Sequence, residues 1–490
     1  MNILSESLFR YLLAADADSR TLSTRANRTG YGTEIGYSAK RQFGSCTAST
    51  PSKKSFRRSL KTFNSLGLEN ANLHDPEIAS NLYNIIRESL LEIYQLKSTG
   101  CSVFLTPSGT DVEMLSSYIL SNNYSSPITN FVLAPAEIGS GSVNSVGGRR
   151  FSSIAPDGSL GEVGSLEFSE LSDQSVRLIE FRDSDTSPFE YEKWEANLLQ
   201  ELKETPGQKT LHYVNCSKTG IEVPKLSTIR KIQELYQDEI DIIVDAAQAR
   251  MEEQDIRKWI EDGMIVFITG SKFFSSPPFC CALFVPDKYD ISNTWSSDFH
   301  TYFDQCSFPE ICRDSDSQII QSKPRTGHLV RWLFGVENMK SYFSIPKEIR
   351  DEFIQNFHNE VSSSITKMGG PFELLDSENH TFPSHKSIVS FFLNNGSGFG
   401  NVSFNDLRKI YYYFQNNNDT FHIPQPTKLL HETNDSGVFR LSIGSDMIEQ
   451  LVDLSNQLSM DEAMYKLKND IKNCLDELSN VSSLLQQYRK

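Results

Sequence analysis

Residues 240–274 read IDIIVDAAQARMEEQDIRKWIEDGMIVFITGSKFF. The apolar run 240–246 holds Asp245 near its end, and a second apolar run, 264–270, ends just before Lys272. The residues between the two runs predict a helix. Uniformly apolar runs joined by helices indicate strands of a mostly parallel sheet that is covered on both faces. Because such a sheet binds its ligands at the carboxyl ends of its strands, Asp245 and Lys272 are predicted to lie at one crevice.

Apolar runs and helical patterns also alternate before residue 240, and one more apolar run follows residue 274. Helical patterns occupy residues 110–120 and 226–237 in addition to 253–263. The apolar runs fall at 101–105, 129–134, 176–181, 211–215, 240–246, 264–270 and 281–286. The pattern predicts an α/β fold with a mostly parallel seven-stranded sheet.

The remaining segments suggest how the chain is divided. Residues 1–76 show no sustained period over most of their length and predict an arm and loops, ahead of a large domain at 77–300. A smaller C-terminal α/β domain is expected at 301–458, and an amphipathic helix at 459–490. This helix carries an apolar stripe that predicts docking on its own domain or on a second subunit, formed by Met464, Leu467, Ile471, Leu475, Leu478 and Leu485.

Composition narrows the class of partner. A chain of 490 residues is long enough for two or three structural units, and its net charge of −16 disfavours nucleic acid and anionic membranes as partners. We find no apolar window of about 18 residues, and the first residues carry acids where a secretory signal would be apolar. We therefore expect a cytoplasmic protein with a small-molecule substrate, reduced cysteines and no metal site.

The first candidate site is the turn Ser108-Gly109-Thr110, between a predicted strand and a predicted helix. A helix start offers unpaired N–H groups and a positive dipole end, and glycine lets an anion approach the backbone closely. The turn therefore suits a phosphate group. It is equally compatible with an ordinary N-cap, in which Ser108 or Thr110 only caps the helix.

Asp245 and Lys272 are the other two candidates. A carboxylate at the end of a buried strand is costly unless a positive or hydrogen-bonded group faces it, so Asp245 could pair with a protonated ring nitrogen, and Gln248 could reach the same ligand. A helix-capping role for Asp245 is the alternative. Burial lowers the pKa of a lysine such as Lys272, as Schiff-base chemistry requires, although a lone lysine is more often a surface group.

The ordered set of phosphate-type loop, acid and lysine resembles the pattern of fold type I enzymes that use pyridoxal 5'-phosphate (PLP), and within them the class V aminotransferase and cysteine desulfurase group. The resemblance implies a Schiff base on Lys272 and an ion pair between Asp245 and the pyridine nitrogen. It further implies a set of residues that hold the cofactor, namely Ser108, Gly109, Thr110, Asn215, Ser217, Gln248, Thr269 and Ser271.

The resemblance also implies a substrate site. Arg440, in the segment GVFRLS, matches a family position at which an arginine binds the α-carboxylate of an amino acid, and Arg325 and Arg331 are alternatives. Two positions depart from the family pattern. The loop 135–141 offers no ring to stack on the cofactor and carries Glu137 instead, and Ser271 stands where histidine is frequent.

These motifs imply a cofactor more strongly than a reaction, because PLP activates whichever bond of the substrate α-carbon is aligned with its ring. We expect aminotransferase-type chemistry on an amino acid, in a homodimer as the resemblance implies. A carbon–sulfur or other β-elimination lyase is the second hypothesis, and a non-catalytic PLP-fold binding protein is the third. Cysteine desulfurase chemistry is disfavoured because Cys306 and Cys312 lie too early in the chain and close to acids.

Overall fold

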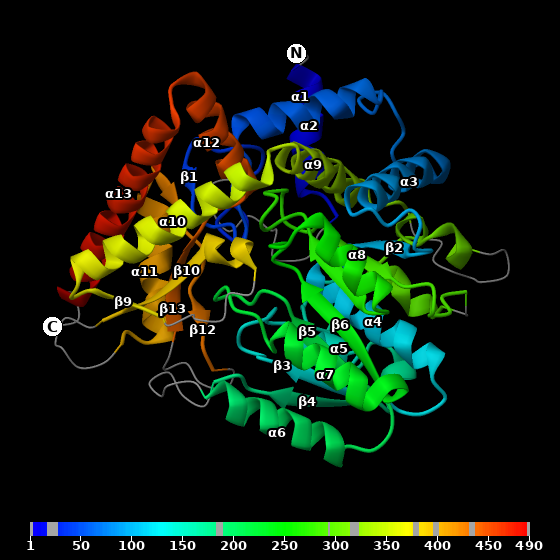
Figure 1. Ribbon diagram of the computed structural model, residues 1–490. Helices are drawn as coiled ribbons and strands as arrows, with labels where there is room; N and C mark the ends of the chain where they lie inside the picture. Colours follow the sequence, from blue (N-terminus) through cyan, green and yellow to red (C-terminus); the bar gives the residue numbers. More distant parts are fainter. Residues whose placement is uncertain are drawn as a thin grey trace.

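The computed structural model describes residues 3–16, 28–182, 190–292, 295–313, 323–375, 382–394, 401–430 and 437–487. Parts of the predicted arm (17–27) and of the irregular segment after the large sheet (314–322) lie outside the described residues, as does the side chain of Leu485. The described chain forms a seven-stranded sheet, a four-stranded sheet and a two-stranded sheet, with helices packed around them (Figure 1).

The larger sheet has seven strands in the order β2-β8-β7-β6-β5-β3-β4. Only β8 runs antiparallel to its two neighbours in this order, so the prediction of a mostly parallel seven-stranded sheet is confirmed. Each predicted apolar run forms one of its strands. They are β2 Ser102–Thr106, β3 Thr129–Leu133, β4 Ser175–Ile179, β5 Lys209–Val214, β6 Ile240–Ala246, β7 Ile265–Thr269 and β8 Cys281–Val285.

Helices cover both faces of this sheet, which explains why its central strands β6 and β7 are buried at every position and mostly apolar. They are α4 Gly109–Asn123, α5 Ser142–Val146, α6 Tyr191–Glu204, α7 Leu226–Tyr236 and α8 Glu253–Glu261. Helix α3 (Pro76–Ile93) begins where the sequence predicts a helical face, and the Asp75 carboxylate caps it by accepting from the Glu77 N–H at 2.9 Å.

The smaller sheet has the order β12-β13-β10-β9 and lies beside the carboxyl ends of the large sheet's parallel strands (Figure 1). Its strands are β9 Phe372–Leu374, β10 Ile388–Leu393, β12 Thr427–Lys428 and β13 Gly437–Ser442. The helices around it are α10 Lys347–Met368, α11 Phe404–Asn417, α12 Ser445–Gln457 and α13 Met460–Gln487, and α9 Thr326–Phe343 runs between the two halves.

Helix α13 packs on α10, α11 and α12 of the same chain. Its apolar stripe is covered there, since Leu467, Ile471, Leu475 and Leu478 are at most 1 % exposed. Of the two roles predicted for this stripe, the structure shows docking within the chain. The expectation of a homodimer therefore depends on the family resemblance alone.

The expectation of loops near the N-terminus is wrong for two segments. Helix α1 (Ile3–Ala14) and helix α2 (Lys53–Ser65) both pack against α9. In α2 the buried Phe56, Leu60 and Phe63 recur every three or four residues, but three basic residues separate them and obscure the period. Between these helices, β1 (Arg41–Gln42) pairs with β11 (Phe421–His422), so the N-terminal segment crosses to the small sheet.

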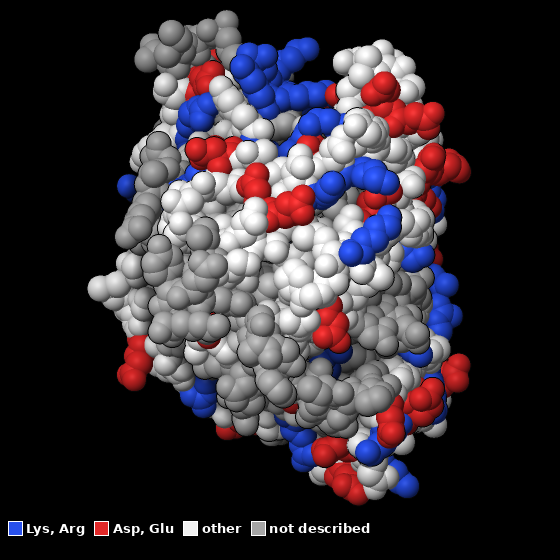
Figure 2. Space-filling model, turned by 90° about the vertical axis from the view of Figure 1, so that its left-hand side faces the viewer, with Lys and Arg blue, Asp and Glu red and all other residues white. Residues whose placement is uncertain are grey.

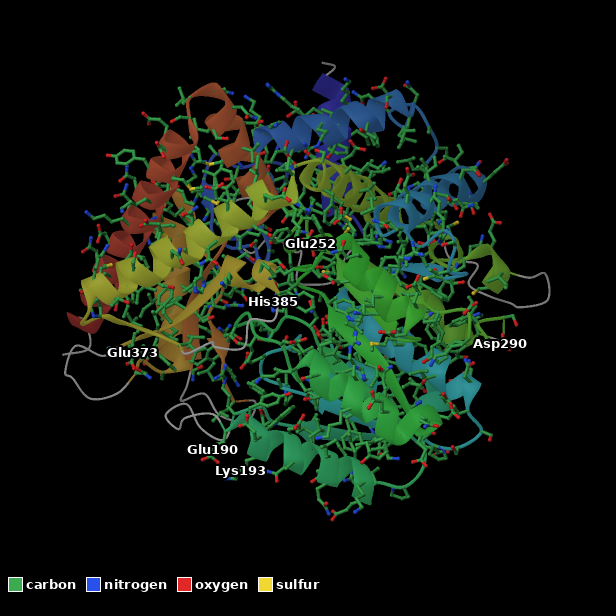
Figure 3. The ribbon with its side chains drawn as sticks, in the orientation of Figure 1. Glu190, Lys193, Glu252, Asp290, Glu373 and His385 are labelled. Atoms are coloured by element: carbon green, nitrogen blue, oxygen red, sulfur yellow. The ribbon has the colours of Figure 1, made fainter. Side chains whose placement is uncertain are left out.

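A buried arginine connects the part of the chain around the large sheet to the part around the small sheet. Arg250 is fully buried, and its guanidinium donates to Ile443 O at 3.0 Å, to Ser45 Oγ at 2.9 Å and to Ser387 Oγ. The ion pair between Arg350 and Glu252, 2.9 Å long, lies nearby. Figure 3 shows Glu252 and His385 at this junction, between the large sheet and the small sheet.

The outer surface gives few indications of a partner. Among the described residues visible on the face in Figure 2, acidic and basic side chains are interspersed and no patch of one sign dominates. Within the described part of the chain, every helix is too short or too polar to cross a membrane.

Candidate active site

A cavity of about 460 Å³ lies at the carboxyl ends of β5, β6 and β7, where the small sheet and the N-terminal segment meet the large sheet. Loops from all three parts contribute to its wall. Nine of the predicted site residues line it, namely Ser108, Gly109, Thr110, Asp245, Gln248, Thr269, Ser271, Lys272 and Arg440. Residues spread over more than 300 positions of the sequence are thus brought to one place.

The turn before α4 is both a helix cap and one end of this cavity. Ser108 has extended backbone angles, and its Oγ accepts from the N–H groups of Thr110 and Asp111 at 3.2 and 3.3 Å. A Cβ added to Gly109 would lie 3.6 Å from its nearest neighbour, Phe267, so protein packing alone does not require glycine there. The positive end of the 15-residue helix therefore faces the cavity with its backbone accessible to an anion.

Asp245 lies at the end of β6 with its carboxylate in the cavity wall. Its Oδ1 accepts from the Ala247 N–H at 2.9 Å, so it stabilises its own turn as well. Burial raises the pKa of Asp245, and the nearby positive charge of Lys272 opposes this shift. A cation placed in the cavity would stabilise the ionised carboxylate in the same way.

Lys272 follows β7 and extends into the same cavity. Burial lowers the pKa of its ammonium group, while Asp245 acts in the opposite direction. The hydroxyl of Thr269 donates to Ala247 O at 2.7 Å and so ties the loop after β7 to the loop after β6. The lysine and the aspartate are therefore held on two connected loops of adjacent strands.

Three predicted cofactor residues make contacts that the sequence does not reveal. The Gln248 side chain lines the cavity, but its Nε2 donates to Cys46 O at 2.9 Å. Asn215 is fully buried behind the wall, where its backbone N–H donates to Asp245 O at 3.0 Å. Ser217 also lies behind the wall and donates to Glu137 Oε2 at 2.7 Å. Cofactor contacts by Asn215 and Ser217 remain predictions.

Glu137, the unusual residue of the loop after β3, has a structural partner. Its Oε1 accepts from Arg182 Nε at 2.8 Å, and its Oε2 accepts from the hydroxyls of Ser217 and Thr219. The carboxylate is therefore neutralised and connects this loop to the loop after β5. Glu137 therefore has a structural role in joining these two loops.

Of the three candidate arginines, only Arg440 lines the cavity. Its Nη1 donates to Lys218 O at 2.9 Å, and its Nη2 donates to Thr47 Oγ1 at 3.0 Å and to Gln425 O. Arg325 instead binds backbone carbonyls of residues 300–302, and Arg331 binds Phe279 O and the carbonyls at the end of α1. Arg440 is therefore the candidate arginine that reaches the cavity.

Two further titratable residues of the wall were not predicted from the sequence. Glu113, on α4, is 2 % exposed, and burial and the neighbouring Asp245 raise its pKa well above the usual range. Lys218, in the loop after β5, has its pKa lowered to about 7, first by burial and then by Arg440. Cys306 and Cys312 are buried and do not belong to the wall.

The architecture is fold type I of the PLP-dependent enzymes, as the resemblance implied. Three solved structures illustrate the likeness, which at this level of identity concerns the fold alone. The cysteine desulfurase CsdA of Escherichia coli has a TM-score of 0.55 at 12% identity, with 89% of this chain and 95% of that chain covered.

A phosphoserine aminotransferase of Cytophaga hutchinsonii has a TM-score of 0.50 at 12% identity, with 86% of this chain and 99% of that chain covered. The glutamate decarboxylase of Lactobacillus brevis has a TM-score of 0.51 at 12% identity, with 89% and 88% covered. No family model matches the sequence, and no curated protein matches it. Because the three similar structures are named for three different reactions, the fold does not determine the chemistry.

Proposed function

We propose that the chain is a PLP-dependent enzyme that acts on an amino acid. The observation that carries the proposal is the cavity wall that joins Lys272, Asp245 and the N-terminus of α4. These three groups match the aldehyde, the ring nitrogen and the phosphate of PLP in chemical character. When bound, PLP withdraws electrons from the bonds of the substrate α-carbon.

The proposal assigns a role to several residues of the wall. The backbone of Gly109 and the hydroxyls of Ser108, Thr110 and Ser271 bind the phosphate, and Asp245 holds a proton on the ring nitrogen. Lys272 binds the cofactor covalently through Nζ. Because burial lowers the pKa of Lys272, the unprotonated amine is favoured, and it can also accept a proton at Nζ and deliver it to a neighbouring carbon.

We infer aminotransferase-type chemistry as the reaction, because it needs a lysine that moves a proton and an arginine that orients an α-carboxylate. Lys272 and Arg440 line the same cavity and satisfy both needs. We further propose a homodimer in the cytoplasm. Among the described residues no two cysteines form a disulfide, as that compartment favours.

The test begins with purified protein incubated with PLP. We expect a new absorbance band in the visible or near-ultraviolet range, and borohydride should then fix the cofactor on the peptide that contains Lys272. Lys272→Ala should abolish fixation, whereas Lys231→Ala, a change at a lysine on the exposed side of α7, should not. Fixation on another lysine, or no bound PLP, would refute the proposal. A scan of amino acids for spectral change then identifies the reaction.

A further inference from the structure

Three cationic side chains line the part of the cavity wall that faces the small sheet. They come from the loop after β5 (Lys218), from β12 (Lys428) and from β13 (Arg440). Arg440 connects these segments, because it donates to Lys218 O and to Gln425 O. Positive charge is therefore concentrated here in a chain whose net charge is −16.

The acids of the same wall do not neutralise Lys218. Glu137 has both oxygens engaged by Arg182, Ser217 and Thr219, and burial raises the pKa of Glu113 so that its carboxyl favours the neutral form. Asp245 faces Lys272. Among the described residues, no carboxylate lies within ion-pair distance of Lys218, and its Nζ reaches only Ala136 O, at 3.5 Å.

A ligand with one carboxylate would leave one of these cations without an anion. Arg440 uses one N–H of Nη1 and both N–H groups of Nη2 on protein oxygens, so one N–H of Nη1 is left for a ligand carboxylate. A single substrate carboxylate at Arg440 would leave the ammonium of Lys218 in the cavity without a counter-ion. Lys218 is half-buried, and its pKa of about 7 lets the amine lose its proton when no anion faces it, so a second anionic group on the ligand would stabilise the ammonium form.

We propose that the substrate is an amino acid whose side chain carries a second anionic group, a carboxylate, phosphate or sulfonate, and that Lys218 binds this group while Arg440 binds the α-carboxylate. The inference rests on the proposed function for the identity of the site as an amino-acid site. Lys428, whose Nζ lies 5.7 Å from the centre of the Phe404 ring, adds positive charge beside it. Lys218 is a specificity-determining residue in this arrangement.

Proton uptake on ligand binding, and the pH dependence of the affinity, report specifically on Lys218. Its pKa of about 7 is lowered by burial, Arg440 and Lys272 and raised by Glu137 and Asp245. The ammonium form predominates below this pKa, and a bound anion raises the pKa further. Binding of a dianion above pH 7 should therefore be accompanied by proton uptake, and affinity should fall as the pH rises through about 7.

The experiment measures binding of ligands that have no amine and so cannot react. Glutarate and 3-phosphonopropionate provide two anionic groups, and butyrate provides one. Titration calorimetry on the PLP-loaded protein, in buffers of different ionisation enthalpy, should show the two dianions binding roughly tenfold or more tightly than butyrate, which corresponds to one charge-assisted hydrogen bond. Proton uptake at pH 8 should accompany them.

Lys218→Met should reduce the affinity for both dianions to that for butyrate and remove the proton uptake. Lys218→Arg should retain the preference without the proton uptake, and Lys231→Met on α7 should change neither quantity. Equal affinity for butyrate and the dianions, no measurable binding, or a preference that survives Lys218→Met would overturn the inference.

Failure of the proposed function gives a different pattern. If borohydride fixes no PLP, but the same titration on protein without PLP shows a preference for dianions that depends on Lys218, the amino-acid enzyme is refuted and an anion site remains. If PLP is fixed on Lys272 and the preference is absent, the inference about the substrate alone is wrong.

Discussion

Replacing Arg250 by methionine should destabilise the junction between the two halves of the molecule. The guanidinium is fully buried and makes three well-formed hydrogen bonds, to Ser45, Ser387 and Ile443. Methionine fills a similar volume but cannot donate. Ile443 O then loses its donor from Arg250, whereas the two serine hydroxyls keep other partners in Ser442 and Ser384.

The expected loss follows from these contacts. A hydrogen bond from a charged donor contributes up to about 3 kcal/mol, but the substitution also removes a desolvated cation, so about 1 kcal/mol per bond, roughly 3 kcal/mol in all, is a reasonable net value. For a large domain, roughly 2 °C in Tm accompanies each kcal/mol, so the Tm should fall by about 6 °C.

Differential scanning calorimetry measures this change at a fixed scan rate and protein concentration. Arg257→Met is the matched control, since Arg257 lies on the exposed side of α8 and pairs only with Glu261 four residues on. Its Tm should stay within about 1 °C of the wild type. A Tm for Arg250→Met that equals that of the control would refute the argument that Arg250 fastens the junction.

The other predictions concern the site, the assembly and acid stability. Asp245→Asn should keep the fold by circular dichroism and lose most turnover, because a neutral amide no longer holds a proton on the ring nitrogen, and near-normal activity would reduce Asp245 to a cap. Arg440→Ala should mainly raise KM at unchanged PLP content, and release of the cofactor would contradict that assignment. Sedimentation should show a dimer, and a fully active monomer would exclude one. Burial lowers the pKa of His212 from 6.5 to about 4, so the unfolded chain binds a proton there more readily, and stability should fall as pH drops from about 6.5 toward 4. His212→Leu should flatten that part of a thermal-denaturation profile, and an unchanged slope would show that other groups determine it.

The large sheet was predictable because its central strands are buried on both faces. A strand such as Ile240–Ala246 must then be apolar at nearly every position, and the turns between strands and helices stand out against such runs. The same contrast identifies Asp245 and Lys272, since each is a charged residue at the end of an apolar run or just after it. Their convergence in one cavity follows from the parallel order of β6 and β7.

Lys218 and Glu113 could not be identified in this way. Lys218 lies in a polar loop, and only the approach of β13 makes it part of a buried wall. Glu113 looks like an ordinary helical glutamate until the cavity is assembled around it. The hydroxyl of Ser217 donates to Glu137, a contact that its position in the motif does not indicate. Such features depend on contacts between distant parts of the chain.

The crossing of the N-terminal segment to the small sheet has a consequence for protein synthesis. Cys46 donates its N–H to Ser442 Oγ across 396 residues of sequence, and Arg41 pairs with Phe421. At translation speeds of about 5–20 residues per second, a partner that distant leaves the ribosome roughly 20–80 s later. For that time the N-terminal segment of the nascent chain cannot form its native contacts with these residues. The complete cavity wall includes Arg440, so a ligand that contacts this residue cannot guide the folding steps that precede its synthesis.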